Sequence, residues 1–121
     1  MSITVLRAKI HRATVTDASL DYEGSLGIDS ALMEKVGLLH YEKILVGNIT
    51  NGNRFETYVI PEPAGSRTIA LNGAVCHLGK VGDLLVIMAF TAIPQEEARA
   101  WRPPTIVLAD NNQRIQKEFN L

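Results

Sequence analysis

Short segments in which apolar and polar residues alternate run along most of the chain, a pattern typical of strands with one buried face. Ile3 and Val5 alternate with polar neighbours, and the alternation resumes at Ala13 and Val15 beyond a basic stretch. Leu84–Ala92 is a longer, almost wholly apolar run, which predicts a buried strand. The pattern therefore predicts a protein built mainly from strands.

Turn residues separate these segments. Asn51-Gly52, between two segments of strand-like composition, is the strongest hairpin signal in the chain. Asn72-Gly73 and Gly82-Asp83 mark further turns, and Asn111-Asn112 predicts a last hairpin. Many short strands joined by such turns predict a closed β-barrel.

Two short helices are expected among the strands. A cap at Asp29 or Ser30 predicts a helix that ends before Gly37, a residue that often follows a last helical turn. Pro94 and the acidic residues after it suit the first turn of a second helix. Because no repeat, low-complexity segment or linker divides the chain, we expect a single domain over residues 1–121.

Composition narrows the class of protein. The chain has 46% apolar and 21% charged residues and a net charge of −1, which argues against nucleic-acid or membrane-surface partners. The longest apolar run is seven residues, far short of the ~20 that span a bilayer, and residues 1–10 lack a signal-peptide pattern. The single cysteine, Cys76, is typical of a reducing compartment. We therefore expect a cytoplasmic protein.

The dipeptide Gly24-Ser25 offers the most distinctive chemistry. A serine hydroxyl can attack the preceding carbonyl, and elimination of the resulting ester breaks the chain and leaves a pyruvoyl group in place of the serine. Gly24 suits this because glycine tolerates strained backbone conformations. A ketone made this way is an electron sink of the kind that most enzymes take from a bound cofactor. Gly-Ser is also common in ordinary turns, and a second copy stands at Gly65-Ser66.

Four cationic side chains lie near expected strands or turns: Lys9, His11, Arg12 and Arg54. Each alone is typical of a solvated strand face. Alternation along the second strand of the hairpin puts Arg54 and Tyr58 on one face and Thr57 on the other. Arg54 and Tyr58 can therefore line one pocket, whereas Thr57 needs a twist or bulge to join them. Tyr58 could also be a core tyrosine with a bonded hydroxyl.

Other common site patterns are absent from the sequence. The three histidines, His11, His40 and His77, have no metal-ligand spacing, so we expect no metal. The glycines form no phosphate-binding loop, and no serine–histidine–acid triad follows from spacing.

Taken together, several segments resemble the bacterial aspartate 1-decarboxylase family, whose members are pyruvoyl enzymes that make β-alanine for pantothenate. The matching segments are in the family's order and at its spacing: Lys9–Arg12, Tyr22–Ser25, Thr50–Tyr58, Asn72–Ala74, Val81–Asp83 and Glu96–Pro103. The resemblance covers nearly the whole chain. It implies a six-stranded double-psi β-barrel with small capping helices, a homotetramer, and active sites between neighbouring subunits.

The resemblance also implies a role for individual residues. Ser25 is the nucleophile and the Gly24 carbonyl its target, while a hydroxyl from Thr57 stabilises the developing oxyanion. Tyr58 is the acid that returns a proton to the α-carbon of the substrate.

Substrate binding is assigned to a second group of residues. A cation on the leaving carboxylate would stabilise the ground state, so Arg54, with Lys9, is assigned to the carboxylate that stays. Thr57 is assigned to substrate binding as well, and backbone donors are expected from the turn that begins at Asn72: Asn72, Gly73, Ala74 and Val75.

The expected reaction is pyruvoyl-dependent decarboxylation of L-aspartate to β-alanine and CO₂, after cleavage into residues 1–24 and 25–121. Gly47, Val75 and Cys76 depart from the family's pattern, which often has a large aromatic residue at 47 and alanines at 75 and 76. Gly47 could open one wall of the site. Two alternatives stay open: an unprocessed barrel that serves as a binding or assembly module, and a pyruvoyl decarboxylase of another amino acid. A maturation factor also stays open as a partner.

Overall fold

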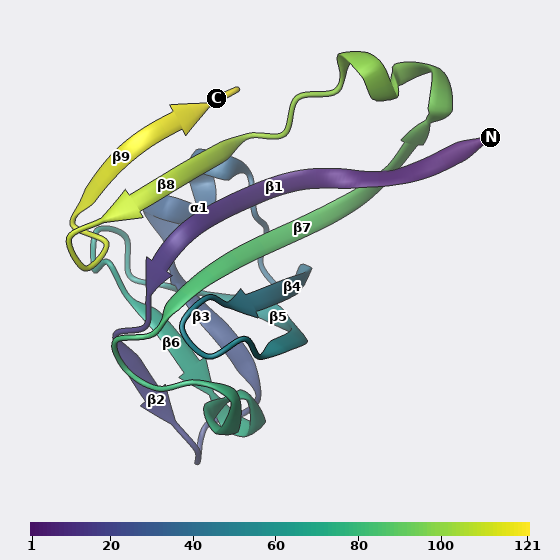
Figure 1. Cartoon of the computed structure of the whole chain (residues 1–121). Helices are drawn as coiled ribbons and strands as arrows, with labels where there is room; N and C mark the ends of the chain where they lie inside the picture. Colours follow the sequence, from purple (N-terminus) through teal and green to yellow (C-terminus); the bar gives the residue numbers. More distant parts are fainter.

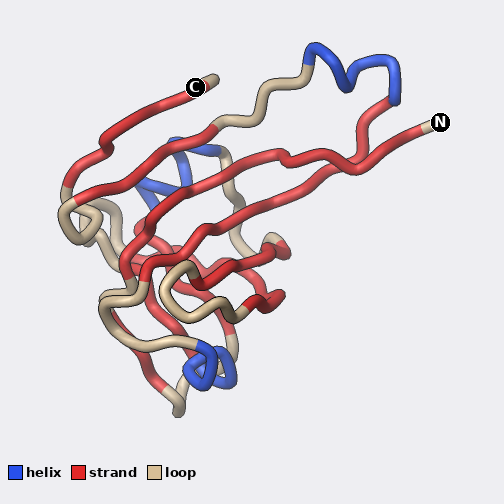
Figure 2. The backbone as a smooth tube through the Cα atoms, in the orientation of Figure 1, coloured by secondary structure: helices blue, strands red, loops and turns tan.

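The computed structural model describes all residues, 1–121. A mixed nine-stranded sheet forms most of the chain, with one α-helix and two 3-10 helices beside it (Figures 1 and 2). In chain order the elements are β1 (Ser2–Thr14), β2 (Asp17–Ser19), β3 (Ser25–Asp29), α1 (Ser30–Val36), β4 (Lys43–Asn48), β5 (Arg54–Glu62), β6 (Ile69–Asn72), η1 (Gly73–Leu78), β7 (Leu84–Pro94), η2 (Gln95–Ala100), β8 (Thr105–Ala109) and β9 (Arg114–Phe119). The prediction of a mainly β protein is confirmed.

The strands follow the order β2-β6-β3-β5-β4-β7-β1-β8-β9 in the sheet. Three neighbouring pairs are parallel, β1–β8, β2–β6 and β3–β5, and the others are antiparallel. The sheet thus has nine strands rather than six, and its end strands, β2 and β9, do not pair with each other.

Both hairpins that the turn residues predicted are confirmed. β4 and β5 pair without a register shift, and the turn between them closes through Gly52 N–H to Asn48 O at 2.8 Å. β8 and β9 are joined by Asp110, Asn111 and Asn112, whose φ values of 55°, 54° and 68° are all left-handed. Asparagine and aspartate tolerate this region better than other non-glycine residues, which explains the turn.

The first predicted helix is α1, and its ends are those that the sequence indicated. The Asp29 carboxylate accepts a hydrogen bond from Ala31 N–H at 2.8 Å, and Gly37 ends the helix with φ +78°. The second predicted helix is η2, a 3-10 helix that follows Pro94.

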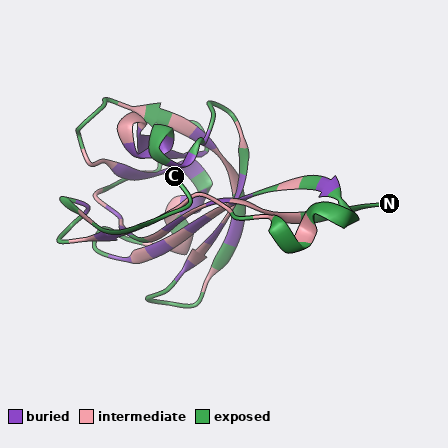
Figure 3. Ribbon diagram, turned by 90° about the horizontal axis from the view of Figure 1, so that it is seen from above, coloured by how far each residue is buried: buried purple, intermediate pink, exposed green.

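The longest strands, β1 and β7, pair along their whole length and extend beyond the rest of the sheet, with η2 at their tip (Figure 1). β1 is a single strand with register shifts near Leu6 and near Arg12, which has φ 63°. The strand predicted at Leu84–Ala92 is part of β7, but its burial is only partial, because alternate residues face the core. Figure 3 shows buried positions gathered in the body and exposed ones along the extension.

No strand was predicted at Ser25–Asp29, yet β3 is buried at all five positions. β3 lies between β5 and β6, and α1 and η1 contact it. Leu26 and Ile28 belong to one core of 22 buried residues that extends from β1 to β8. Separately, none of the helices has the length and apolar character needed to cross a membrane.

Candidate active site

Ser25 is the first residue of β3, and its side chain is buried (2% exposed) although serine is polar. It pairs with Asn72, the last residue of β6, across the antiparallel β3–β6 ladder. The Asn72 side-chain amide donates a hydrogen bond to Ser25 Oγ at 3.1 Å. Oγ accepts this bond and keeps its own proton available to donate, so the hydroxyl is held in place without being blocked.

The peptide that precedes Ser25 is packed against Gly73, the first residue of η1. Gly73 has φ +70°, a conformation that L side chains rarely adopt. A Cβ at this position would lie 2.8 Å from Gly24 N, Gly24 Cα and Tyr22 O. Only glycine therefore lets the backbone after β6 approach the segment 22–24 this closely.

Gly24 itself is less constrained than the sequence analysis expected. Its φ lies outside the left-handed region, and a Cβ there would meet no atom within 4 Å. The intact chain therefore shows no backbone strain or close approach at Gly24 that would demand glycine.

The parallel β3–β5 ladder brings Tyr58 beside Ser25. Leu26 pairs with Val59 in this ladder, so one step back along both strands Ser25 is level with Tyr58. Neighbours across a parallel ladder point to the same face, so both side chains lie on the face opposite the buried Leu26 and Val59. One further step brings Thr57 level with Gly24.

Thr57 faces the other way, as the alternation predicted. β5 has no register shift against β4 or β3, so no bulge turns Thr57 towards the face of Tyr58. Thr57 is, however, level with Gly24, which lies outside β3. Beyond the end of that strand, the Gly24 carbonyl is not confined to one face of the sheet.

Arg54 and Lys9 do not contact Ser25 in the single chain. Arg54 is exposed at the start of β5, four residues and about 13 Å along the strand from Tyr58 at ~3.3 Å per residue. Lys9 lies on β1, separated from β3 by β5, β4 and β7. Neither side chain has a hydrogen-bond or ion-pair partner in the structure, so both cations remain free to bind an anion.

Cross-strand neighbours place Gly47 in one row with two basic residues. Arg54 pairs with Gly47, Gly47 with Val86, and Val86 with His11 across β5, β4, β7 and β1. A Cβ at Gly47 would lie 3.0 Å from Val86 Cγ1. The Val86 side chain therefore covers the space beside Gly47, and a larger residue at position 47 would have to displace it.

His11 is the one titratable group whose environment clearly perturbs it. Burial is the largest cause that lowers the pKa of His11, and the neighbouring charges of Lys9 and Arg12 lower it further. His11 Nδ1 is buried and has no hydrogen-bond partner. Both facts favour the neutral imidazole.

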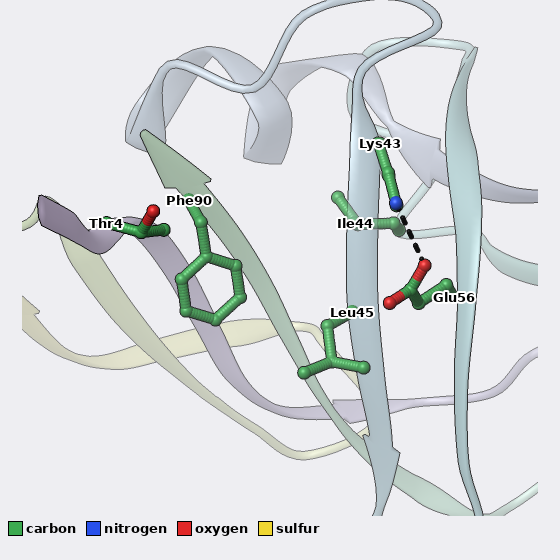
Figure 4. A pocket seen from close by; sticks show the side chains of 6 residues that line it. All are labelled: Thr4, Lys43, Ile44, Leu45, Glu56 and Phe90. Atoms are coloured by element: carbon green, nitrogen blue, oxygen red, sulfur yellow. Dashed lines mark ion pairs between the residues drawn. The ribbon is translucent and has the colours of Figure 1, made fainter. Parts of the chain in front are cut away.

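Two hollows open on the surface. The larger, about 310 Å³, lies between β1, β7, β4 and β5 (Figure 4) and is lined by Thr4, Lys43, Ile44, Leu45, Glu56 and Phe90. Its only ion pair joins Lys43 Nζ to Glu56 Oε2 at 3.0 Å, and it contains none of the predicted site residues. The smaller, about 270 Å³, is lined in part by Asn72, the residue whose side chain is bonded to Ser25.

The rest of the turn after Asn72 is divided between surface and core. Ala74 is exposed, whereas Val75 is buried and belongs to the core. The Cys76 thiol donates to Leu71 O at 2.9 Å. The departures at 75 and 76 are therefore accommodated by packing.

Sequence reasoning missed several residues around the site. Asp17, Tyr22 and Glu62 line the smaller hollow, and the ring of Tyr41 lies 6.0 Å from that of Tyr58. Tyr22 belongs to the segment Tyr22–Ser25 that the sequence had indicated, whereas Asp17, Glu62 and Tyr41 carried no sequence signal because long-range packing brings them there. No group of three or more histidine, cysteine or acidic side chains gathers to form a metal site.

Comparison with known proteins tests the resemblance. The sequence profile of the family described as "Aspartate decarboxylase" matches residues 1–116. A protein named aspartate 1-decarboxylase from Caldicellulosiruptor saccharolyticus is 52% identical over 99% of this chain and 93% of its own length. Proteins of the same name from Caulobacter vibrioides (49% identical, 97% of this chain, 98% of the relative) and Clostridium botulinum strain Loch Maree (48%, 99% and 94%) are similar.

The chain belongs to the aspartate decarboxylase family. The family resemblance inferred from the sequence is confirmed, and with it the prediction of a decarboxylase, a carbon–carbon lyase. Aspartate decarboxylases carry a pyruvoyl group, and the residues present fit its formation. Ser25 is buried, its hydroxyl is held by Asn72, and the preceding peptide is packed against Gly73.

Proposed function

We propose that this protein decarboxylates L-aspartate to β-alanine and CO₂ for pantothenate synthesis, through a pyruvoyl group made from its own Ser25. Family membership supports the reaction. The observation that carries the site assignment is the buried Ser25 hydroxyl, bonded to Asn72 and level with Tyr58. An isolated Gly-Ser turn would have no reason to bury and fix its hydroxyl.

The first step is cleavage of the chain. Ser25 Oγ attacks the Gly24 carbonyl carbon, the C–N bond breaks, and the proton passes from oxygen to the freed amine, giving an ester. Elimination then removes a proton from Cα of residue 25 and releases the Gly24 carboxylate, after which water displaces ammonia and leaves the ketone. Thr57, level with Gly24, stabilises the oxyanion of the attack, a role typically worth about 10²–10³ in rate.

In the second step the protein's residues hold the substrate and move one proton. Once formed, the pyruvoyl group supplies a carbonyl that withdraws the electron pair left on the α-carbon when CO₂ departs. The Tyr58 hydroxyl returns a proton to that carbon, since a phenol is ordinarily protonated at neutral pH. Backbone groups of the turn Asn72–Ala74 bind the substrate beside Ser25.

The remaining carboxylate of aspartate binds to Arg54 and Lys9. A guanidinium can hold both oxygens of a carboxylate, and neither cation has a partner within the chain. Because β5, β4 and β7 separate Lys9 from Ser25, we infer that a neighbouring subunit supplies Lys9. This supports the homotetramer with active sites between subunits that the family resemblance implies.

The pairing of strands also supports a six-stranded double-psi barrel as the core. Removing the three-residue β2 and the β8–β9 hairpin leaves six strands, β6-β3-β5-β4-β7-β1. The segment 2–19 reaches both edges of this set, because β1 is one edge and β2 pairs with β6, the other edge. Beside β2, Thr16 N–H donates to Ile69 O at 2.8 Å, so one bent segment links the two edges.

Two further parts of the proposal rest on composition and family alone. The single cysteine supports a reducing compartment, and hence a cytoplasmic location. A maturation factor remains a proposed partner, because neither Thr57 nor Asn72 is a strong base that would speed the attack.

Intact-mass measurement of the purified protein tests the proposal. We expect a fragment that ends at Gly24 and a second that begins with a ketone-bearing residue 25. Ser25→Ala should remain a single chain and be inactive. Aspartate decarboxylation by Ser25→Ala would reject the pyruvoyl assignment, and a wild-type chain that never cleaves would favour an unprocessed binding module.

The separate roles of Tyr58 and Thr57 can be distinguished by when each variant fails. Tyr58→Phe should cleave its chain normally but decarboxylate aspartate about 10²–10⁴-fold more slowly, because it lacks the proton donor. Thr57→Val should instead delay the appearance of the two fragments on a denaturing gel. Normal turnover by processed Tyr58→Phe would reject the acid role.

A further inference from the structure

Tyr41 is a surface aromatic residue in an unusual backbone conformation. Its φ of 68° is left-handed, which is uncommon for a bulky residue and costs stability. Its side chain is 67% exposed, so burial of the ring does not compensate for this cost. Strained residues persist only where surrounding contacts fix them, and they concentrate at functional sites.

The contacts that fix Tyr41 lie along β5, next to Tyr58. Tyr41 N–H donates to Val59 O at 2.8 Å, and Val59 N–H donates to Glu42 O at 3.0 Å. These two bonds attach the segment 41–42 to the residue that follows Tyr58.

Side-chain bonds make the same turn rigid. The Glu42 carboxylate accepts from Leu39 N–H at 3.0 Å, which closes the turn. The same carboxylate forms a two-pronged ion pair with Arg7 of β1, whose Nε lies 2.9 Å from Glu42 Oε2. An exposed turn is thus anchored to both β1 and β5.

This turn places the Tyr41 ring beside Tyr58. The Tyr41 and Tyr58 rings lie 6.0 Å apart at an angle of 46°, within the range of favourable tilted aromatic pairs. The His40 ring stacks on the Tyr41 ring, with centroids 3.8 Å apart and an angle of 21°. Tyr58 therefore has a ring neighbour that is itself held in place.

We propose that Tyr41 is a positioning residue for Tyr58: its ring restricts the Tyr58 ring so that the hydroxyl keeps its aim at the reacting carbon. The inference rests on the proposed acid role of Tyr58. Tyr41 acts through ring contact alone, so its own hydroxyl is dispensable. The strained backbone is retained because it brings the ring to this position.

Steady-state kinetics on fully processed enzyme test the proposal. Tyr41→Ala should lower kcat by about two- to tenfold, the worth of one aromatic pair, and leave KM for aspartate unchanged. Tyr41→Phe should keep the wild-type kcat. Tyr41→Gly suits the left-handed backbone and should match Tyr41→Ala, which covers the case that Tyr41→Ala folds poorly. Phe119→Ala, at an exposed ring without a ring partner, is the matched control and should change nothing.

A double-mutant cycle decides whether Tyr41 acts through Tyr58. In the Tyr58→Phe background, Tyr41→Ala should cause no further loss, because no hydroxyl remains to be aimed. An equal loss in both backgrounds, no loss in either, a raised KM, or a loss in Tyr41→Phe would each overturn the inference while leaving the acid role of Tyr58 intact. Full turnover by Tyr58→Phe alone would instead reject the acid role, and the inference with it.

Discussion

Adding one methyl group at Gly73 should shift Gly24 away from the geometry that cleavage requires and so slow the cleavage. A Cβ at Gly73 would lie 2.8 Å from Gly24 N, Gly24 Cα and Tyr22 O, whereas ordinary contacts begin at 3.4 Å. All three are backbone atoms, so they cannot rotate away as a side chain could. The segment 22–24 must therefore move by about 0.6 Å or more.

A shift of this size is large for a reaction between two neighbouring groups. Misplacement of reacting atoms by ~1 Å can cost about 10²-fold in rate. We therefore expect Gly73→Ala to cleave about ten- to a hundredfold more slowly than the wild type. The assay follows the two fragments over time on a denaturing gel and checks their masses, starting from uncleaved protein.

An alanine at Gly73 also strains a left-handed backbone, and this strain must be distinguished from the clash with the segment 22–24. Gly65→Ala is the control, because it introduces the strain without the clash. Gly65 has φ +82°, and a Cβ there would meet nothing within 4 Å. Both variants should lose about 1–2 kcal/mol of unfolding free energy through strain, which thermal unfolding measures. Equal cleavage rates in Gly73→Ala and Gly65→Ala would refute the reasoning.

Three further predictions concern substrate and pH. Arg54→Lys should raise KM for aspartate by about tenfold, because an ammonium cannot hold both carboxylate oxygens; an unchanged KM would remove Arg54 from the substrate site. Alanine should be a very poor substrate and glutamate an intermediate one, since glutamate keeps the side-chain carboxylate but moves it by one methylene; alanine turning over as fast as aspartate would contradict a carboxylate clamp. In the folded protein the pKa of His11 lies below its ordinary 6.5, so folding favours the neutral imidazole. The free energy of unfolding therefore has its full value above pH 6.5 and decreases as the pH falls through the lower pKa of the folded state. His11→Asn should flatten the fall of unfolding free energy over that range, which equilibrium unfolding at a series of pH values measures; an unchanged slope would contradict this role of His11.

Features governed by neighbouring residues could be predicted from the sequence. Asp29 and Gly37 mark the ends of α1 because a carboxylate satisfies free N–H groups and glycine adopts the left-handed cap. Asn51-Gly52 and Asn111-Asn112 mark the hairpins because these residues accept the backbone angles that the turns need. The outward face of Arg54 and Tyr58 followed from strand alternation alone, and so did the opposite face of Thr57.

Features that depend on distant segments could not be predicted in this way. β3 lacks a local pattern because all its residues are buried, and it is a strand only because β5 and β6 lie on either side. The number of strands in the sheet depends on edge pairings such as β2–β6 and β8–β9, which the local pattern does not specify.

The proposed active site likewise combines features that the local sequence predicts with features that depend on distant segments. The sequence by itself indicated the residues that we propose carry the chemistry, Gly24-Ser25 and Thr57-Tyr58, because reactivity belongs to the residue types and their order along the chain. Only the tertiary structure decided what surrounds them: Asn72 on the Ser25 hydroxyl, Gly73 against Gly24, and Tyr41 beside Tyr58. The physical reason is that hydrogen bonds and close packing act over a few ångströms in space, between residues that the sequence can place far apart.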